Sequence, residues 1–312
     1  GAEVTTEQVW HMVQSLYHAK NEEERKAADK WLKDFQGSAA AWGVLDQLLR
    51  ADGVTEETQF FAANSLRSKI NHRDLAQIDT AARDSLAGSL MSHIHKFRNG
   101  PMVVRTQLCL SFSAYAGQFD RTQNNIVQDV CTSLGSSPET VPVLLELLTL
   151  LGEEAYRVNE DYFDLPPDDQ HPLLLSARSS ALPVLNFLHQ CFAGAEAGGA
   201  QRKEIMAAFT RWLRFGAVQP NEIIQSPIVQ QAIPSLKVDK MCEVASDLLC
   251  ELAYISRDLS QGMPIFQLLT SHLQTFFELY QEAMTKDDEV LARAVTRIIS
   301  EMGENYCSVI AE

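Results

Sequence analysis

Closely spaced histidines and cysteines are the first residues in this sequence that could do chemistry, as metal ligands. His93 and His95 lie two positions apart, and so do His189 and Cys191. On a helix, side chains two positions apart point to different faces, so neither pair can hold one metal ion. We therefore expect no metal site and no cofactor.

Motifs for nucleophilic or phosphate chemistry are absent from the sequence. It has no GxSxG elbow, no GxGxxG run and no Walker loop. Its six cysteines form no CxxC pair and have no zinc-ligand spacing, and most fall among apolar residues. We expect free thiols in a reduced, intracellular protein that is not an enzyme.

Residues 158–170 form an acidic segment with five carboxylates. A calcium loop needs acids at fixed odd positions and a glycine turn, and this segment has neither. A solvated acidic loop is the favoured interpretation. The alternative is an acidic finger that contacts a basic partner, with Tyr162, Phe163 and Leu165 fixing its position.

Residues 55–71 form an expected helix with one apolar and one polar side. At 100° per residue, Ala63, Leu66 and Ile70 share the apolar side. The opposite side gathers Phe61, Asn64, Ser65, Ser68 and His72, flanked by Arg67 and Lys69. An aromatic residue on a polar side either packs against a neighbouring repeat or contacts a partner, and the sequence leaves both open for Phe61.

Arg105 offers a similar choice. It can form a structural ladder with carboxylates of the adjacent repeat, or it can bind an acidic group of a partner. The ladder is the favoured interpretation.

The elements that position these residues are expected to be helices throughout, because apolar residues recur with helical periodicity. Breakers divide the chain into seven expected helix pairs, and a repeat of roughly 40 residues is typical of HEAT or armadillo units. The pairs are 5–19 with 22–36, 39–51 with 55–71, 79–98 with 101–119, 124–134 with 139–157, 171–193 with 200–216, 219–236 with 240–257, and 263–285 with 287–309. Pro183 and Pro234 fall inside expected helices and predict kinks.

This pattern predicts an all-α fold, a right-handed α-solenoid of about seven HEAT repeats built from antiparallel helix pairs. Repeats 1–4 occupy residues 1–157, the acidic loop 158–170, and repeats 5–7 residues 171–312. The final helix reaches Glu312 without a polar capping repeat. We therefore expect the array to be cut from a longer one.

Composition narrows the function classes. The chain is 46% hydrophobic, which excludes disorder over most of its 312 residues. A formal charge of −15 disfavours direct nucleic-acid binding, and it fits a basic partner or simple solubility equally well. The longest apolar stretch, 141–151, contains Glu146 and is too short to cross a bilayer, so we expect no membrane span.

Several segments resemble, in order, the transportin-SR branch of the importin-β (karyopherin) family. They are VQSLYH at 13–18, ADKWL at 28–32, FQ at 35–36, AW at 41–42, SLRSKI at 65–70, VRTQL at 104–108, LLELLTLLGEE at 144–154 and AFTRWLR at 208–214. The likeness spans nearly the whole chain but only about a third of a family member. It departs after Glu154, where relatives carry a basic stretch and this chain has the acidic segment.

The resemblance implies a monomeric nuclear import receptor that shuttles between nucleus and cytoplasm. Such receptors bind Ran-GTP, contact FG nucleoporins, and in this branch carry Arg/Ser-rich cargo, mainly through later repeats. It nominates six residues for Ran binding: Phe61, Asn64, Arg67 and Ser68, with Arg105 and Thr106 behind them. The alternative is a HEAT-repeat scaffold or adaptor that is unrelated to Ran.

Overall fold

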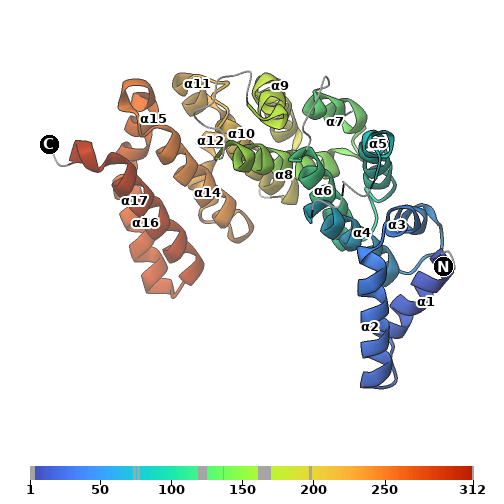
Figure 1. Cartoon of the computed structure of the whole chain (residues 1–312). Coiled ribbons are helices and arrows are strands. Elements are labelled where there is room, and N and C mark those ends of the chain that lie inside the picture. The colour runs from blue at the N-terminus through green and yellow to red at the C-terminus, as the bar shows by residue number, and fades with distance from the viewer. Residues whose placement is uncertain are drawn as a thin grey trace. The chain divides into compact units, whose positions relative to one another are not determined.

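The computed structural model of the chain describes residues 4–72, 75, 78–118, 125–135, 137–160, 170–196 and 199–310 (Figure 1). Every regular element in these ranges is a helix, and the helices pack in pairs. The predicted all-α, HEAT-repeat fold class is confirmed. Contacts group the chain into two units, Gly1–Leu174 and Leu175–Glu312.

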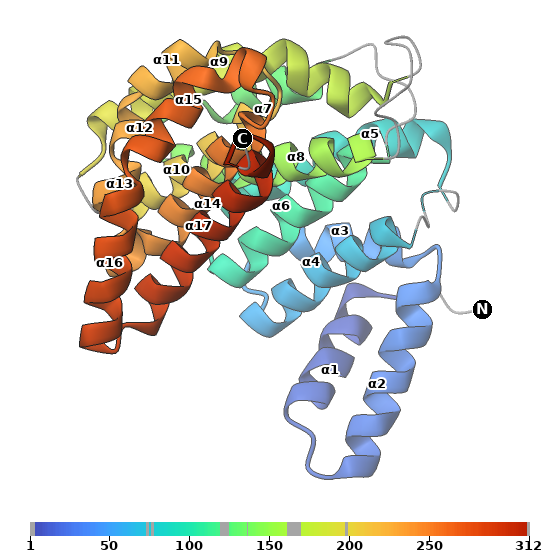
Figure 2. The same ribbon diagram turned by 90° about the vertical axis from the view of Figure 1, so that its left-hand side faces the viewer.

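The first unit is built from four helix pairs within the described ranges. They are α1 (Thr6–Tyr17) with α2 (Glu22–Gly37), α3 (Ala41–Arg50) with α4 (Glu56–Asn71), α5 (Thr80–Lys96) with α6 (Met102–Ala116), and α7 (Ile126–Leu134) with α8 (Val141–Glu160). The second helices stack directly, α4 on α6 and α6 on α8 (Figure 2). Buried Leu66, Leu108 and Leu148 lie along this stack, and their removal from water stabilises each repeat against the next.

Short polar residues start several of these helices. The Thr5 side chain accepts a hydrogen bond from the Gln8 backbone, and the Gln8 side chain returns one, forming a capping box. Asn21, Asp79 and Asn125 cap α2, α5 and α7 in the same way. Because these caps are local, the sequence located the starts of these helices to within two residues.

The second unit contains α9 from Leu175 onward and the helices that follow it. Their bounds are α9 (Pro172–Gly194), α10 (Ala200–Leu213), α11 (Pro220–Gln225), α12 (Pro227–Gln230), α13 (Ala232–Ser235), α14 (Asp239–Ile255), α15 (Leu259–Ser271), α16 (Leu273–Lys286) and α17 (Glu289–Ile310). Here α14 packs between α10 and α17, and α16 packs along α17 (Figure 1).

The prediction of a single helix over residues 219–236 is wrong. It is three short helices, α11 to α13, separated at Ser226 and Gln231. A residue before proline is pushed into extended conformation, and Ser226 precedes Pro227 with φ −60° and ψ 129°. The interruption is therefore larger than the kink expected at Pro234, which lies within α13.

The expected helix 263–285 is also wrong, because His272 divides it into α15 and α16. The first piece begins earlier than expected, at Leu259, where the Asp258 side chain caps the backbone of Ser260. By contrast, α9 continues through Pro183 without ending.

The acidic segment begins later than expected. Residues 158–160 belong to α8, and Val158 is buried. Residues 161–169, including Tyr162, Phe163 and Leu165, lie outside the described residues.

Candidate partner-binding surface

A stripe of half-buried side chains runs along α4 on the side away from its apolar contacts. Phe61, Asn64, Arg67 and Ser68 all lie on it, at helical spacing. Neither Phe61 nor Asn64 is sealed between repeats, so both can reach a partner. Phe61, Asn64 and Ser68, which the sequence placed on the polar side, are partly exposed, and so is Arg67, which was expected to flank that side. Their contact with a partner stays a prediction.

Two residues expected near this face are instead buried. Ser65 is 0% exposed, and its Oγ accepts a hydrogen bond of 2.6 Å from Gln36 Nε2 of α2. Lys69 is 2% exposed, and its Nζ donates to the carbonyls of Gln36 at 2.9 Å and Ser38 at 3.0 Å. Lys69 was expected to flank the polar side, but it instead satisfies carbonyl groups where α2 ends.

Arg105 and Thr106 continue the surface on α6, and both meet Glu146 of α8. Arg105 Nε donates to Glu146 Oε2 at 2.9 Å, and Thr106 Oγ1 donates to Glu146 Oε1 at 2.5 Å. Arg105 and Glu146 side chains are 16% and 20% exposed. The favoured interpretation of Arg105 as a rung between repeats is confirmed. Its contact with a partner remains a prediction.

Arg67 has a rung of its own, from Nη1 to Gln107 Oε1 at 3.1 Å. Sequence reasoning missed the acceptors Gln107 and Glu146. The sequence spacing could have identified these acceptors. Arg67 and Gln107 are 40 residues apart, and so are Thr106 and Glu146. One repeat therefore separates each donor from its acceptor.

Replacing Glu146 by alanine tests how strongly this ladder holds α6 to α8. Both Arg105 and Thr106 lose their shared acceptor, so we expect the free energy of unfolding to fall by about 2 kcal/mol. Urea denaturation followed by circular dichroism measures the change. Glu139→Ala is the matched control, since its ion pair with Arg98 is 65% exposed on the carboxylate side and should contribute less than about 0.5 kcal/mol. Equal losses in the two variants would contradict the ladder.

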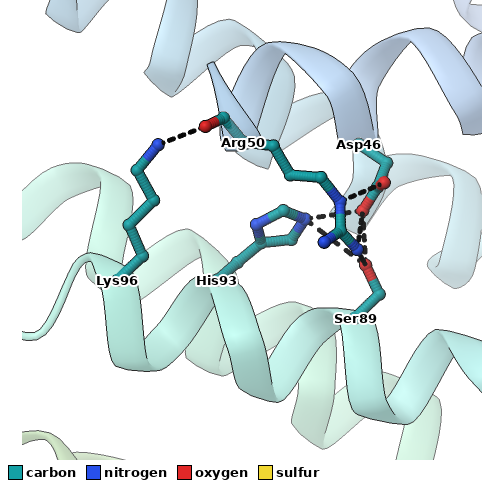
Figure 3. A network of polar contacts seen from close by, with 5 residues as sticks. All are labelled: Asp46, Arg50, Ser89, His93 and Lys96. Atoms are coloured by element: carbon teal, nitrogen blue, oxygen red, sulfur yellow. Dashed lines mark hydrogen bonds and ion pairs between the residues drawn. The ribbon is translucent and has the colours of Figure 1, made fainter. Parts of the chain in front are cut away.

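A Ser, a His and an Asp meet between α3 and α5 (Figure 3). His93 Nε2 lies 2.7 Å from Asp46 Oδ1 and 3.4 Å from Ser89 Oγ, and Ser89 also donates directly to Asp46. In a catalytic triad the two ring nitrogens bridge serine and aspartate, whereas here a single nitrogen meets both. This cluster joins two repeats and does not activate a nucleophile.

The buried cysteine thiols in the described part of the chain are not activated as nucleophiles. Burial raises the pKa of the Cys131 thiol to about 11, and burial likewise raises the pKa of Cys109 and Cys242. Among the residues that the structure describes, no three His, Cys, Asp or Glu side chains come close enough to hold a metal ion. In the same residues, every helix is too short or too polar to cross a bilayer.

Comparison with known protein families matches two adjacent parts of the chain. Residues 28–93 match the Importin-beta N-terminal domain, and residues 101–249 match the Exportin 1-like protein family. Over these residues the chain is similar to proteins of the importin-β/exportin family. Since this family consists of nuclear transport receptors, which are not enzymes, the expectation that the chain is not an enzyme is confirmed.

Individual relatives of the family cover nearly all of the chain. Transportin MOS14 of Arabidopsis thaliana is 29% identical over 306 residues, 95% of this chain. Human Importin-13 is 24% identical over 99% of the chain, and the mRNA transport regulator MTR10 of Saccharomyces cerevisiae is 25% identical over 96%. The chain spans 31% to 32% of the length of these three relatives.

Proposed function

We propose that this chain is part of a nuclear import receptor of the transportin-SR branch and that it binds Ran-GTP through α4 and α6. The contact residues in this proposal are Phe61, Asn64, Arg67 and Ser68 of α4, with Arg105 and Thr106 of α6. The observation that carries it is the accessible stripe on α4, within the part of the chain that matches the Importin-beta N-terminal domain.

The chemistry of the stripe suits a protein partner. Phe61 supplies an aromatic surface, Asn64 and Ser68 can donate and accept hydrogen bonds, and Arg67 supplies a cation. Interface contacts that matter most are enriched in aromatic and arginine side chains at the centre of a patch. Exposed Met102 and Val103 begin α6 and add apolar area on the neighbouring helix.

The remaining roles concern the longer protein in which such a chain works. There we propose that the receptor is monomeric, shuttles between nucleus and cytoplasm, contacts FG nucleoporins and carries Arg/Ser-rich cargo. Ran-GTP would favour one arrangement of the repeats and cargo another, so that binding of one releases the other. The name of one similar relative, Transportin MOS14, supports the transportin assignment.

The experiment that tests the Ran proposal replaces Arg67 by glutamate. A reversed charge in a protein interface faces groups selected for the original sign, so we expect binding to Ran-GTP to weaken at least about tenfold. Biolayer interferometry with immobilised Ran, loaded with a non-hydrolysable GTP analogue or with GDP, measures this. Far-ultraviolet circular dichroism should stay nearly unchanged, because Arg67 loses only its hydrogen bond to Gln107.

Arg293→Glu is the matched control, because Arg293 is exposed on α17 and the substitution makes the same change in charge. It should bind Ran-GTP like the unmodified chain. The proposal fails if the unmodified chain binds the two nucleotide states equally or binds neither, which favours a scaffold unrelated to Ran. It also fails if the two variants weaken binding to the same extent.

A further inference from the structure

A cavity of about 360 Å³ lies within the second unit, well apart in sequence from the proposed Ran surface. It is lined by residues of α9, α10 and α13, by Gln231 between α12 and α13, and by residues at the start of α14. Phe192, Val238 and Met241 give it apolar walls, and Arg202 and Gln231 give it polar ones. A mixed lining of this kind is typical of a site that orients a small part of a ligand.

Arg202 is held in a fixed orientation in this cavity. Its guanidinium carbon lies 4.4 Å from the centre of the Phe192 ring, and its Nε donates to the Ala195 carbonyl at 3.1 Å. A guanidinium stacked on an aromatic ring loses little further freedom when it binds an anion. The two terminal Nη groups are therefore held in a fixed position from which they can donate hydrogen bonds to a ligand.

Those Nη groups have no hydrogen-bond acceptor and no carboxylate partner among the described residues. Arg105 and Arg214 are also partly shielded, and each pairs with a carboxylate, Glu146 or Glu251. A guanidinium fork that lines a cavity without such a partner is suited to bidentate binding of an incoming oxyanion.

Two further features favour an acidic, partly apolar ligand. Val238 is 41% exposed beside the cavity, which leaves an apolar surface for a neighbouring side chain of the ligand. Val238 also precedes α14, and no side chain caps the first backbone N–H groups of that helix. These N–H groups can donate hydrogen bonds to an oxyanion bound at Arg202, beside Asp239 in the first turn of α14.

We infer that this cavity binds an acidic segment of a partner protein, through an Asp or Glu carboxylate on Arg202 and an adjacent large apolar side chain against Val238 and Met241. The inference goes beyond the proposed Ran surface, since none of its residues lies in α4 or α6. The chemistry that recognises this partner is a carboxylate next to an apolar residue in an extended peptide.

The test uses a fluorescein-labelled ten-residue peptide in which glutamate alternates with leucine, and a counterpart with glutamine in place of glutamate. Fluorescence anisotropy with the whole 312-residue chain measures both affinities. A bidentate, charge-assisted pair should make the acidic peptide bind at least about tenfold more tightly than the neutral one. Arg202→Gln should abolish this preference.

Lys203→Gln is the matched control, because it removes an equal charge from the adjacent exposed residue. It should keep the preference within about twofold. Arg202→Lys keeps the charge but loses the fork, and should bind the acidic peptide with intermediate affinity. The methyl resonance of Met241 should shift on adding the acidic peptide, which places binding at the cavity.

Three results would overturn the inference. One is binding of both peptides with equal affinity, or of neither. Another is an equal loss in Arg202→Gln and Lys203→Gln, which would mean only general attraction between charges. The third is an unchanged Met241 methyl resonance in the presence of saturating acidic peptide.

Discussion

Replacing Asp46 by alanine should lower the free energy of unfolding by about 3 kcal/mol, because one carboxylate serves three donors at the α3–α5 joint. His93, Ser89 and Arg50 all donate to it (Figure 3). His93 is 2% exposed, so in the variant its buried ring nitrogen would keep only the longer contact with Ser89 Oγ, at 3.4 Å. Urea denaturation at neutral pH measures the loss.

The Asp46 contacts between α3 and α5 should also make the stability of the chain depend on pH, and the lowered pKa of Asp46 gives the sign of this dependence. Burial opposes ionisation of Asp46, but hydrogen bonds from His93, Arg50 and Ser89 outweigh it and lower the pKa of this carboxyl group well below its ordinary value. A lowered folded-state pKa adds stability above the unfolded pKa of about 3.9, and this contribution is lost as pH falls through the folded value. The stability difference between the unmodified chain and Asp46→Asn should therefore shrink as the pH falls below about 4.

Asp29→Asn is the control for the Asp46 measurements. Asp29 pairs with Lys33 one turn along α2, and both side chains are largely exposed. Its replacement should change the free energy of unfolding by less than about 0.5 kcal/mol. The prediction would be contradicted by an Asp46→Ala variant as stable as Asp29→Asn. It would also be contradicted if the stability difference between the unmodified chain and Asp46→Asn did not shrink below about pH 4.

Most helices could be predicted from the sequence because their signals are local. Asn21, Asp79 and Asn125 mark helix starts by capping them, and apolar periodicity marks the lengths. The failures at Ser226 and His272 have a physical cause. Pro227 was compatible with continuing a helix as well as with starting a new one, and nothing near His272 resembles a breaker.

The candidate surface could be predicted only in part. Periodicity placed Phe61, Asn64 and Ser68 on one accessible face of α4, because that argument needs only the helix itself. It misplaced Ser65 and Lys69, whose partners Gln36 and Ser38 come from the preceding helix pair, about 30 residues earlier in the chain. A polar residue on a helix indicates a solvent-exposed position only when no neighbouring backbone or side-chain group forms a hydrogen bond with it.

Replacement of Lys69 by alanine is expected to cause the second large loss of stability. Its ammonium group caps the end of α2 and lies 5.1 Å from the centre of the Trp42 ring. Replacement by alanine leaves the Gln36 and Ser38 carbonyls without this donor and opens a space beside Trp42. We expect the free energy of unfolding to fall by about 3 kcal/mol. Amide hydrogen exchange should quicken most in residues 28–37 of α2, whose buried half packs next to this site.

Lys69→Met separates the two causes, because methionine fills similar volume without a donor. If the capping hydrogen bonds dominate, Lys69→Met should lose at least about two thirds of what Lys69→Ala loses. Lys30→Met on the exposed side of α2 is the control and should leave both stability and exchange unchanged. Full stability in Lys69→Met would mean that Lys69 acts only by filling space. Because α2 packs mainly against α1 and only slightly against α3 and α4, loss of the cap should loosen the first repeat while α4 to α8 keep their exchange protection.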